Sequence, residues 1–94
     1  MKSTPEMNNL FRAILTLESE EECYKMFTDI CTVKELQAMA QRLEVAAQLS
    51  AGRNYIAVSE STGASSTTIS RVNRCLLYGE GGYRMVLDRM EEAK

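Results

Sequence analysis

A run of short hydroxyl side chains beside two arginines is the part of this sequence best suited to binding chemistry. From Ser65 to Arg71, six of the seven residues are Ser, Thr or Arg, and the exception is Ile69. Hydroxyl groups and the N–H groups at a helix start bind phosphate oxygens and base edges, and a guanidinium can bind guanine through two hydrogen bonds. The run therefore predicts a nucleic-acid contact by these residues: Ser65, Ser66, Thr67, Thr68, Ser70, Arg71 and Arg74.

Two helices joined by a tight turn are expected to present this run. We predict a first helix at about 55–62 and a second from 66 to about 78, which together form a helix-turn-helix at about 55–76. Gly63 can adopt the left-handed conformation that the turn needs, and Ser65 can cap the second helix. The residues expected to pack between the helices are Val58, Thr62, Ala64, Ile69, Val72 and Leu76.

An ordinary helical hairpin with a Ser/Thr-rich cap is the alternative to a DNA-binding element. The glycine, the cap and the aliphatic spacing are independent features that agree, and this agreement favours the DNA-binding helix-turn-helix.

The rest of the chain also reads as helical. Pro5 suits the first position of a helix, and Ser19 can cap the next one. Thr32 and Glu35 form a capping-box pattern that opens a long helix, for which Gly52 supplies the stop. We expect an all-α fold of five to six short helices in a single domain over residues 1–94. Apolar residues on more than one side of the long helix indicate that it lies buried between other elements, in a monomer or in an entwined dimer. One stripe consists of Leu36, Met39, Ala40, Leu43 and Ala47, and Val45 and Leu49 lie off it.

Composition argues against an enzyme. The chain has no histidine, which is the commonest general base and metal ligand, and its cysteines show no metal-ligand spacing. No cofactor or metal is therefore expected. Its three cysteines lie in apolar helical patterns, where we expect them to be buried, with a redox role as the minor alternative. No apolar run is long enough for a membrane, and the start lacks the pattern of an export signal, so we expect a cytoplasmic protein.

Charge is unevenly distributed along the chain. The net charge is −2, but residues 51–76 carry three arginines against one glutamate. The small basic excess thus coincides with the hydroxyl-rich run.

The long helix "TVKELQAMAQRLEVAAQLSAG" followed by "TGASSTTISRVNRCL" resembles the Trp repressor family, and in particular a subgroup of it from Gram-positive bacteria. The resemblance covers about residues 5 to 92. It implies an entwined homodimer whose two helix-turn-helix elements lie about 34 Å apart and bind a palindromic operator in double-stranded DNA.

The resemblance also implies an effector site. In the Trp repressor, one arginine of the long helix and one of the recognition helix flank the indole ring of tryptophan, and Arg42 and Arg71 occupy the matching places here. The repressor has glycine after the second arginine, whereas this chain has the β-branched Val72. Tryptophan is therefore not expected as co-repressor, and the identity of any effector stays open. Arg42 can equally be a surface arginine that packs its stem on the helix.

The leading hypothesis is a DNA-binding transcriptional regulator, expected to repress by occupying a promoter. The alternative is a protein-interaction adaptor in a transcription or replication assembly, in which the helix-turn-helix is architectural. The acidic segment Glu18–Glu22 with Asp29, together with exposed methionines, would then serve a partner surface. The sequence names neither the operator nor the regulated genes, and it does not separate repression from activation.

Overall fold

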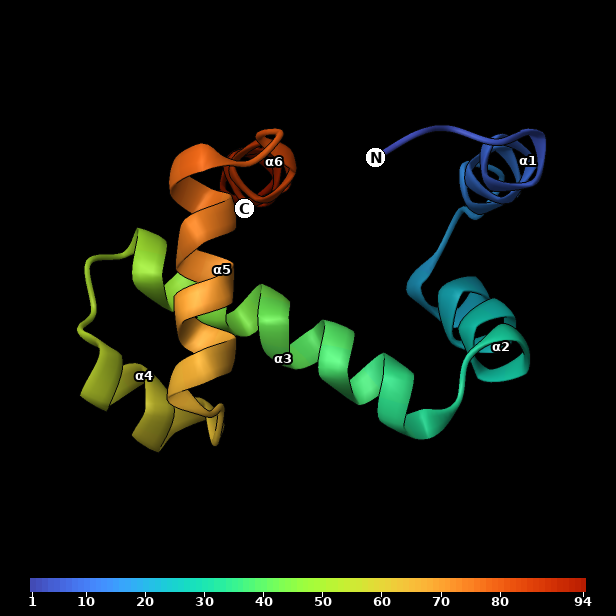
Figure 1. Cartoon of the computed structure of the whole chain (residues 1–94). Coiled ribbons are helices and arrows are strands. Elements are labelled where there is room, and N and C mark those ends of the chain that lie inside the picture. The colour runs from blue at the N-terminus through green and yellow to red at the C-terminus, as the bar shows by residue number, and fades with distance from the viewer. The chain divides into compact units, whose positions relative to one another are not determined.

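The protein is all-helical. The computed structural model describes all residues from 1 to 94 and contains six helices and no strand (Figure 1). This confirms the predicted fold class. None of the helices is both long and apolar enough to cross a membrane. The helices are α1 (Pro5–Ile14), α2 (Glu20–Ile30), α3 (Val33–Ser50), α4 (Tyr55–Thr62), α5 (Ser66–Tyr78) and α6 (Gly82–Glu92).

Contacts divide the chain into two compact units, residues 1–36 and 37–94, with the boundary inside α3. The prediction of one domain over residues 1–94 stays a prediction. We describe each unit by itself.

The first unit is built from capped helices that bury little. Ser19 Oγ accepts a hydrogen bond from the N–H of Glu22 at 3.1 Å, which caps α2. At the start of α3, Thr32 N–H donates to Glu35 Oε1 at 2.8 Å, and Glu35 N–H donates to Thr32 Oγ1 at 3.1 Å. The predicted cap and capping box are thus confirmed. Neither α1 nor α2 contains a buried residue, and half of the Phe11 side chain is exposed.

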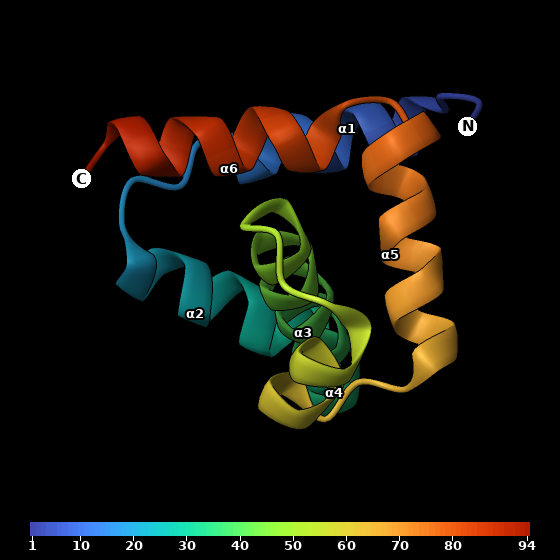
Figure 2. The ribbon, with the colours of Figure 1, turned by 90° about the vertical axis from the view of Figure 1, so that its left-hand side faces the viewer.

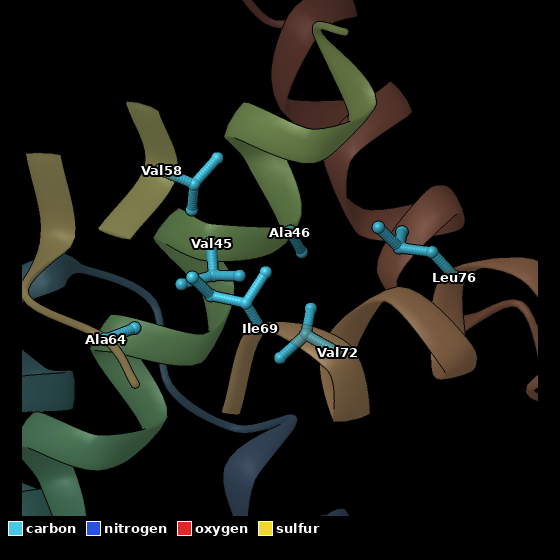
Figure 3. Packing of buried hydrophobic residues seen from close by; sticks show 7 residues of the cluster. All are labelled: Val45, Ala46, Val58, Ala64, Ile69, Val72 and Leu76. Carbon is cyan, nitrogen blue, oxygen red and sulfur yellow. The ribbon is translucent and has the colours of Figure 1, made fainter. Parts of the chain in front are cut away.

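The second unit contains the hydrophobic core. Its buried side chains come from α3, α4, α5 and the turn between the last two, and they converge between these helices (Figure 3). Leu49, Tyr83 and Leu87 pack against this cluster from its edge. The cluster consists of Val45, Ala46, Val58, Ala64, Ile69, Val72 and Leu76.

Only one of the two apolar sides of α3 is buried by the chain itself. Val45 and Ala46 are completely buried, whereas Met39 is 40% exposed and Ala40 is exposed. Leu36, Leu43 and Ala47 are half-buried. The reason is tertiary, because α4 and α5 pack on the face of α3 that carries Val45. A helix with two apolar faces does not reveal from its sequence which face its own chain will cover.

The last helix lies across the end of α5. It is seen along its axis beside α5 in Figure 1 and from its side in Figure 2. Gly81, at φ +83°, is the residue before α6 and lies in the left-handed region. Arg84 Nε donates a hydrogen bond to the carbonyl oxygen of Leu76 at 3.0 Å, so α6 is fixed to the end of α5. The outer face of α6 keeps Val86 and Met90 exposed.

The expected burial of the cysteines is wrong for two of the three. Cys23 and Cys75 are exposed and Cys31 is half-buried, all as free thiols. The apolar pattern that suggested burial is real, but no segment of the chain covers the helix faces on which Cys23 and Cys75 lie.

Candidate nucleic-acid interface

The turn between α4 and α5 has the predicted geometry. Gly63 follows α4 with φ +74° and ψ +4°, in the left-handed region, and its N–H donates to the carbonyl oxygen of Ser59 at 2.8 Å. The hydroxyl of Ser59 in turn donates to the carbonyl oxygen of Ala64 at 3.0 Å. Ala64 is buried beneath the turn. The glycine conformation and the hydrogen bond of Ser59 thus hold the turn that joins α4 to α5.

The start of α5 is capped from within. Ser65 Oγ accepts a hydrogen bond from the N–H of Thr68 at 3.2 Å, and the two hydroxyl oxygens lie 3.1 Å apart in a second hydrogen bond. The N–H groups of Ser66 and Thr67 occupy the first two positions of the helix, where no intrahelical acceptor exists. These two donors, at the positive end of the helix dipole, remain available to an anion.

Five predicted contact residues share one surface on α5, which we call the reading surface. It is concave, encloses about 380 Å³ and lies on the opposite side of α5 from the buried Ile69 and Val72. Both of its arginines are exposed, and neither takes part in a salt bridge. Cations without an acidic partner in their own chain are free to bind an external anion. The reading surface is formed by Ser66, Thr67, Ser70, Arg71 and Arg74.

The other two predicted contact residues lie apart from this surface. The hydroxyls of Ser65 and Thr68 bond to each other in the cap, and Thr68 is half-buried. Their place in the structure fits a role in positioning the helix, which is one of the roles expected for them, more closely than a base contact.

Glutamine side chains that the sequence analysis did not single out tie α4 to α3. Gln41 Nε2 donates to the carbonyl oxygen of Thr62 at 3.2 Å, so one of the free carbonyls at the end of α4 has a partner. Gln48 Nε2 donates to Ser61 Oγ at 2.9 Å. No sequence signal distinguishes these glutamines from other polar residues on a helix, because their partners are distant in the chain.

A second, smaller cleft lies beside the reading surface. The cleft encloses about 180 Å³, and Arg71 lines both this cleft and the reading surface. The half-buried Arg42 lines the same cleft as Arg71. The structure therefore places the two arginines predicted for an effector site beside one cleft. No group of three or more His, Cys, Asp or Glu side chains is placed to hold a metal ion. The cleft is lined by Arg42, Thr68, Arg71, Val72, Cys75 and Tyr83.

Val72, the residue for which tryptophan is not expected as co-repressor, lines the small cleft. Val72 forms part of its wall and is only 2% exposed, because its side chain belongs to the hydrophobic core. Sites for drug-sized ligands typically enclose ~300–1,000 Å³. The cleft is smaller than that range.

The helical fold agrees with comparison to known proteins. A family model described as Trp repressor protein matches residues 5–91. The chain belongs to this family. The predicted resemblance is thereby confirmed.

Relatives of the chain cover almost its whole length. It is 52% identical to the uncharacterised protein YerC of Bacillus subtilis (strain 168) over 95% of this chain and 86% of that protein. Among solved structures, a candidate Trp repressor from Staphylococcus aureus is 48% identical with a TM-score of 0.92, over 95% of this chain and 89% of that one. A TrpR-like protein from Eubacterium eligens ATCC 27750 is 46% identical with a TM-score of 0.92, over 95% and 92% of the two chains.

Proposed function

We propose that this member of the Trp repressor family is a sequence-specific transcriptional regulator that binds double-stranded DNA as a homodimer. One observation carries the proposal. The side of α5 that faces away from the core presents two unpaired arginines, three hydroxyl side chains and two free N–H groups on a single surface. Short hydroxyl side chains let the helix approach the floor of the major groove, and the arginines supply phosphate or guanine contacts.

Homodimer formation is supported by the apolar surface that one chain leaves uncovered. The apolar faces of α1, α2 and α6 contain no buried residue, and several large side chains on them are at least 40% exposed. A small domain buries little apolar surface on its own, and a large exposed apolar patch on it usually marks an interaction site. The partner that the family suggests for this surface is a second copy of the chain. The exposed side chains on these helices include Phe11, Ile30, Met85, Val86 and Met90.

Two-fold symmetry extends the proposal to the operator. A symmetric dimer presents two copies of the reading surface, so the DNA site is expected to be a palindrome with its half-sites one helical turn apart. Such a dimer would repress transcription by occupying a promoter, in the cytoplasm. Two copies also double the local positive charge, although the chain as a whole is acidic.

The arginines of the reading surface provide the direct test. A protein that neutralises phosphates shows an affinity that falls with salt, with a slope of about 0.9 per phosphate contact. If Arg74 contacts a phosphate in both half-sites, Arg74→Ala is expected to lower that slope by about 2 in a dimer. Fluorescence anisotropy on a duplex over a series of salt concentrations measures this directly.

Arg89→Ala is the matched control, because it removes the same charge from the last turn of α6, away from the reading surface. Equal slopes for the wild type, Arg74→Ala and Arg89→Ala, together with equal affinities for the specific duplex, would contradict the assigned surface. If Arg74 reads a base instead, the variant loses ~1–3 kcal/mol of specific binding while binding of unrelated sequences is little changed.

The adaptor hypothesis draws no support from the acidic segment in this structure. Glu22 Oε1 accepts a hydrogen bond from the N–H of Glu18 at 2.8 Å. Glu21 Oε1 lies 3.8 Å from Lys25 Nζ in a salt bridge. These carboxylates therefore serve the start of α2, where negative charge is favourable. A protein that binds a partner without nucleic acid, and no duplex at low salt, would favour the adaptor.

A further inference from the structure

We infer that α5 is braced by side chains of its own chain, chiefly Val72 and Tyr83, so that DNA reading by this protein does not require an indole effector. This inference rests on the proposed function. It concerns the small cleft that Arg42 and Arg71 border, and it is the point at which this chain departs from the tryptophan-binding pattern of its family.

The wall of the cleft is fixed. Val72 points from α5 into the core and lies close to Ile69 there (Figure 3). A valine in a helix has one strongly preferred χ1 rotamer, so its isopropyl group cannot turn aside to admit a ligand. At 2% exposure it also has no empty space into which to move. Admission of an indole ring would therefore require α5 itself to shift.

The remaining volume is too small for an amino acid with an indole side chain. A closed apolar cavity of ~150 Å³ accommodates benzene. The cleft encloses about 180 Å³, and tryptophan has more than twice as many heavy atoms as benzene. Tyr83, which packs against the core from α6, also lines the cleft.

The C-terminal ends of α4 and α5 are each held by a hydrogen bond within the chain. At the end of α4, Gln41 Nε2 donates to the carbonyl oxygen of Thr62 at 3.2 Å. Near the end of α5, Arg84 Nε donates to the carbonyl oxygen of Leu76 at 3.0 Å. A ligand can shift a conformational equilibrium only through different affinities for the two states. Because α5 is already held at its C-terminal end and Val72 is fixed in the wall of the cleft, an indole ligand has little difference in affinity between two states through which to act.

The first arm of the test is isothermal titration calorimetry with tryptophan and with indole, in the absence of DNA. The wild type is expected to bind neither. Val72→Gly removes the wall and is expected to bind indole, with a higher melting temperature in its presence. Val58→Gly is the matched control, because Val58 is an equally buried helical valine that does not line the cleft, and it is expected to bind no indole. If Val72→Gly does not fold, Val72→Ala is expected to bind indole more tightly than the wild type.

The second arm measures affinity for a duplex recovered by selection. The wild type is expected to bind equally well with and without tryptophan. Val72→Gly is expected to bind at least about tenfold more weakly, and added indole should restore part of the loss, which it should not do for Val58→Gly.

The outcomes are distinct. Tryptophan binding by the wild type, or an affinity for DNA that rises about tenfold when tryptophan is added, would overturn the inference and leave the proposed function intact. Indole binding by Val58→Gly as well as Val72→Gly would also overturn it. If no duplex is recovered at all, the proposed function fails, while the calorimetry still decides whether Val72 closes the cleft.

Discussion

Replacement of Gly63 by alanine tests the turn that sets the angle between α4 and α5. At φ +74°, an alanine is in the left-handed region, which costs an L-residue roughly 1–2 kcal/mol. A Cβ atom at this position meets no other atom within 4 Å, so no steric clash adds to that cost. Alanine also reduces the freedom of the unfolded chain, which returns ~0.4–1 kcal/mol of stability. The expected net effect is a loss of about 1 kcal/mol.

Gly82→Ala is the control with the opposite sign. Gly82 lies in the first turn of α6, outside the left-handed region, and a Cβ atom there also meets nothing within 4 Å. Alanine then acts only by reducing the conformational freedom of the unfolded chain, so the free energy of unfolding is expected to rise by ~0.4–1 kcal/mol. Urea unfolding followed by circular dichroism, at one fixed protein concentration, measures both changes. A Gly63→Ala protein that is as stable as Gly82→Ala would refute the left-handed turn.

Three further substitutions probe other parts of the account. Ser65→Ala removes the α5 cap from Thr68 N–H, and urea unfolding is expected to show a loss of ~1 kcal/mol that Ser65→Asp largely avoids. Ile69→Ala leaves a cavity at a completely buried site, and thermal and urea unfolding should show a loss of stability of ~2–5 kcal/mol. A loss less than half of the lower limit of this range would mean that Ile69 is not a main residue of the core. The Glu35 carboxylate accepts a hydrogen bond from Thr32 N–H and, as a second cause, one from the Thr32 side chain, and these lower the pKa of Glu35 below its ordinary value of 4.5. Its stabilising contribution is therefore complete above that value and is lost as pH falls through the lowered one, so the stability difference between wild type and Glu35→Gln should shrink in acid; a difference independent of pH would contradict the capping box.

Local signals in the sequence predicted the part of the fold that positions the reading surface. Gly63, the Ser65 cap and the spacing of Ile69 with Val72 each constrain the backbone within a few residues, so the bounds of α4 and α5 followed from them. The side of α5 that stays exposed followed as well, because a helix has only one face left when the other is aliphatic.

The sequence could not predict what depends on distant partners. Val45 rather than Met39 is buried on α3 because α4 and α5 pack on that face, which no local pattern reveals. The hydrogen bond of Gln41 to the end of α4 spans 21 residues and is likewise invisible in the sequence. The exposed Cys75 shows the same limit, since an apolar helical pattern does not say whether its own chain or another molecule will cover it.

The proposed function rests most directly on whether the purified protein selects a DNA sequence. The decisive measurement is selection of bound duplexes from a random library at two salt concentrations, with light scattering on the same sample. Recovery of a palindrome by a dimer, with half-sites one helical turn apart, is the predicted result. A folded protein that enriches no sequence, with or without added tryptophan, would contradict the assignment of α5 as a DNA-reading helix.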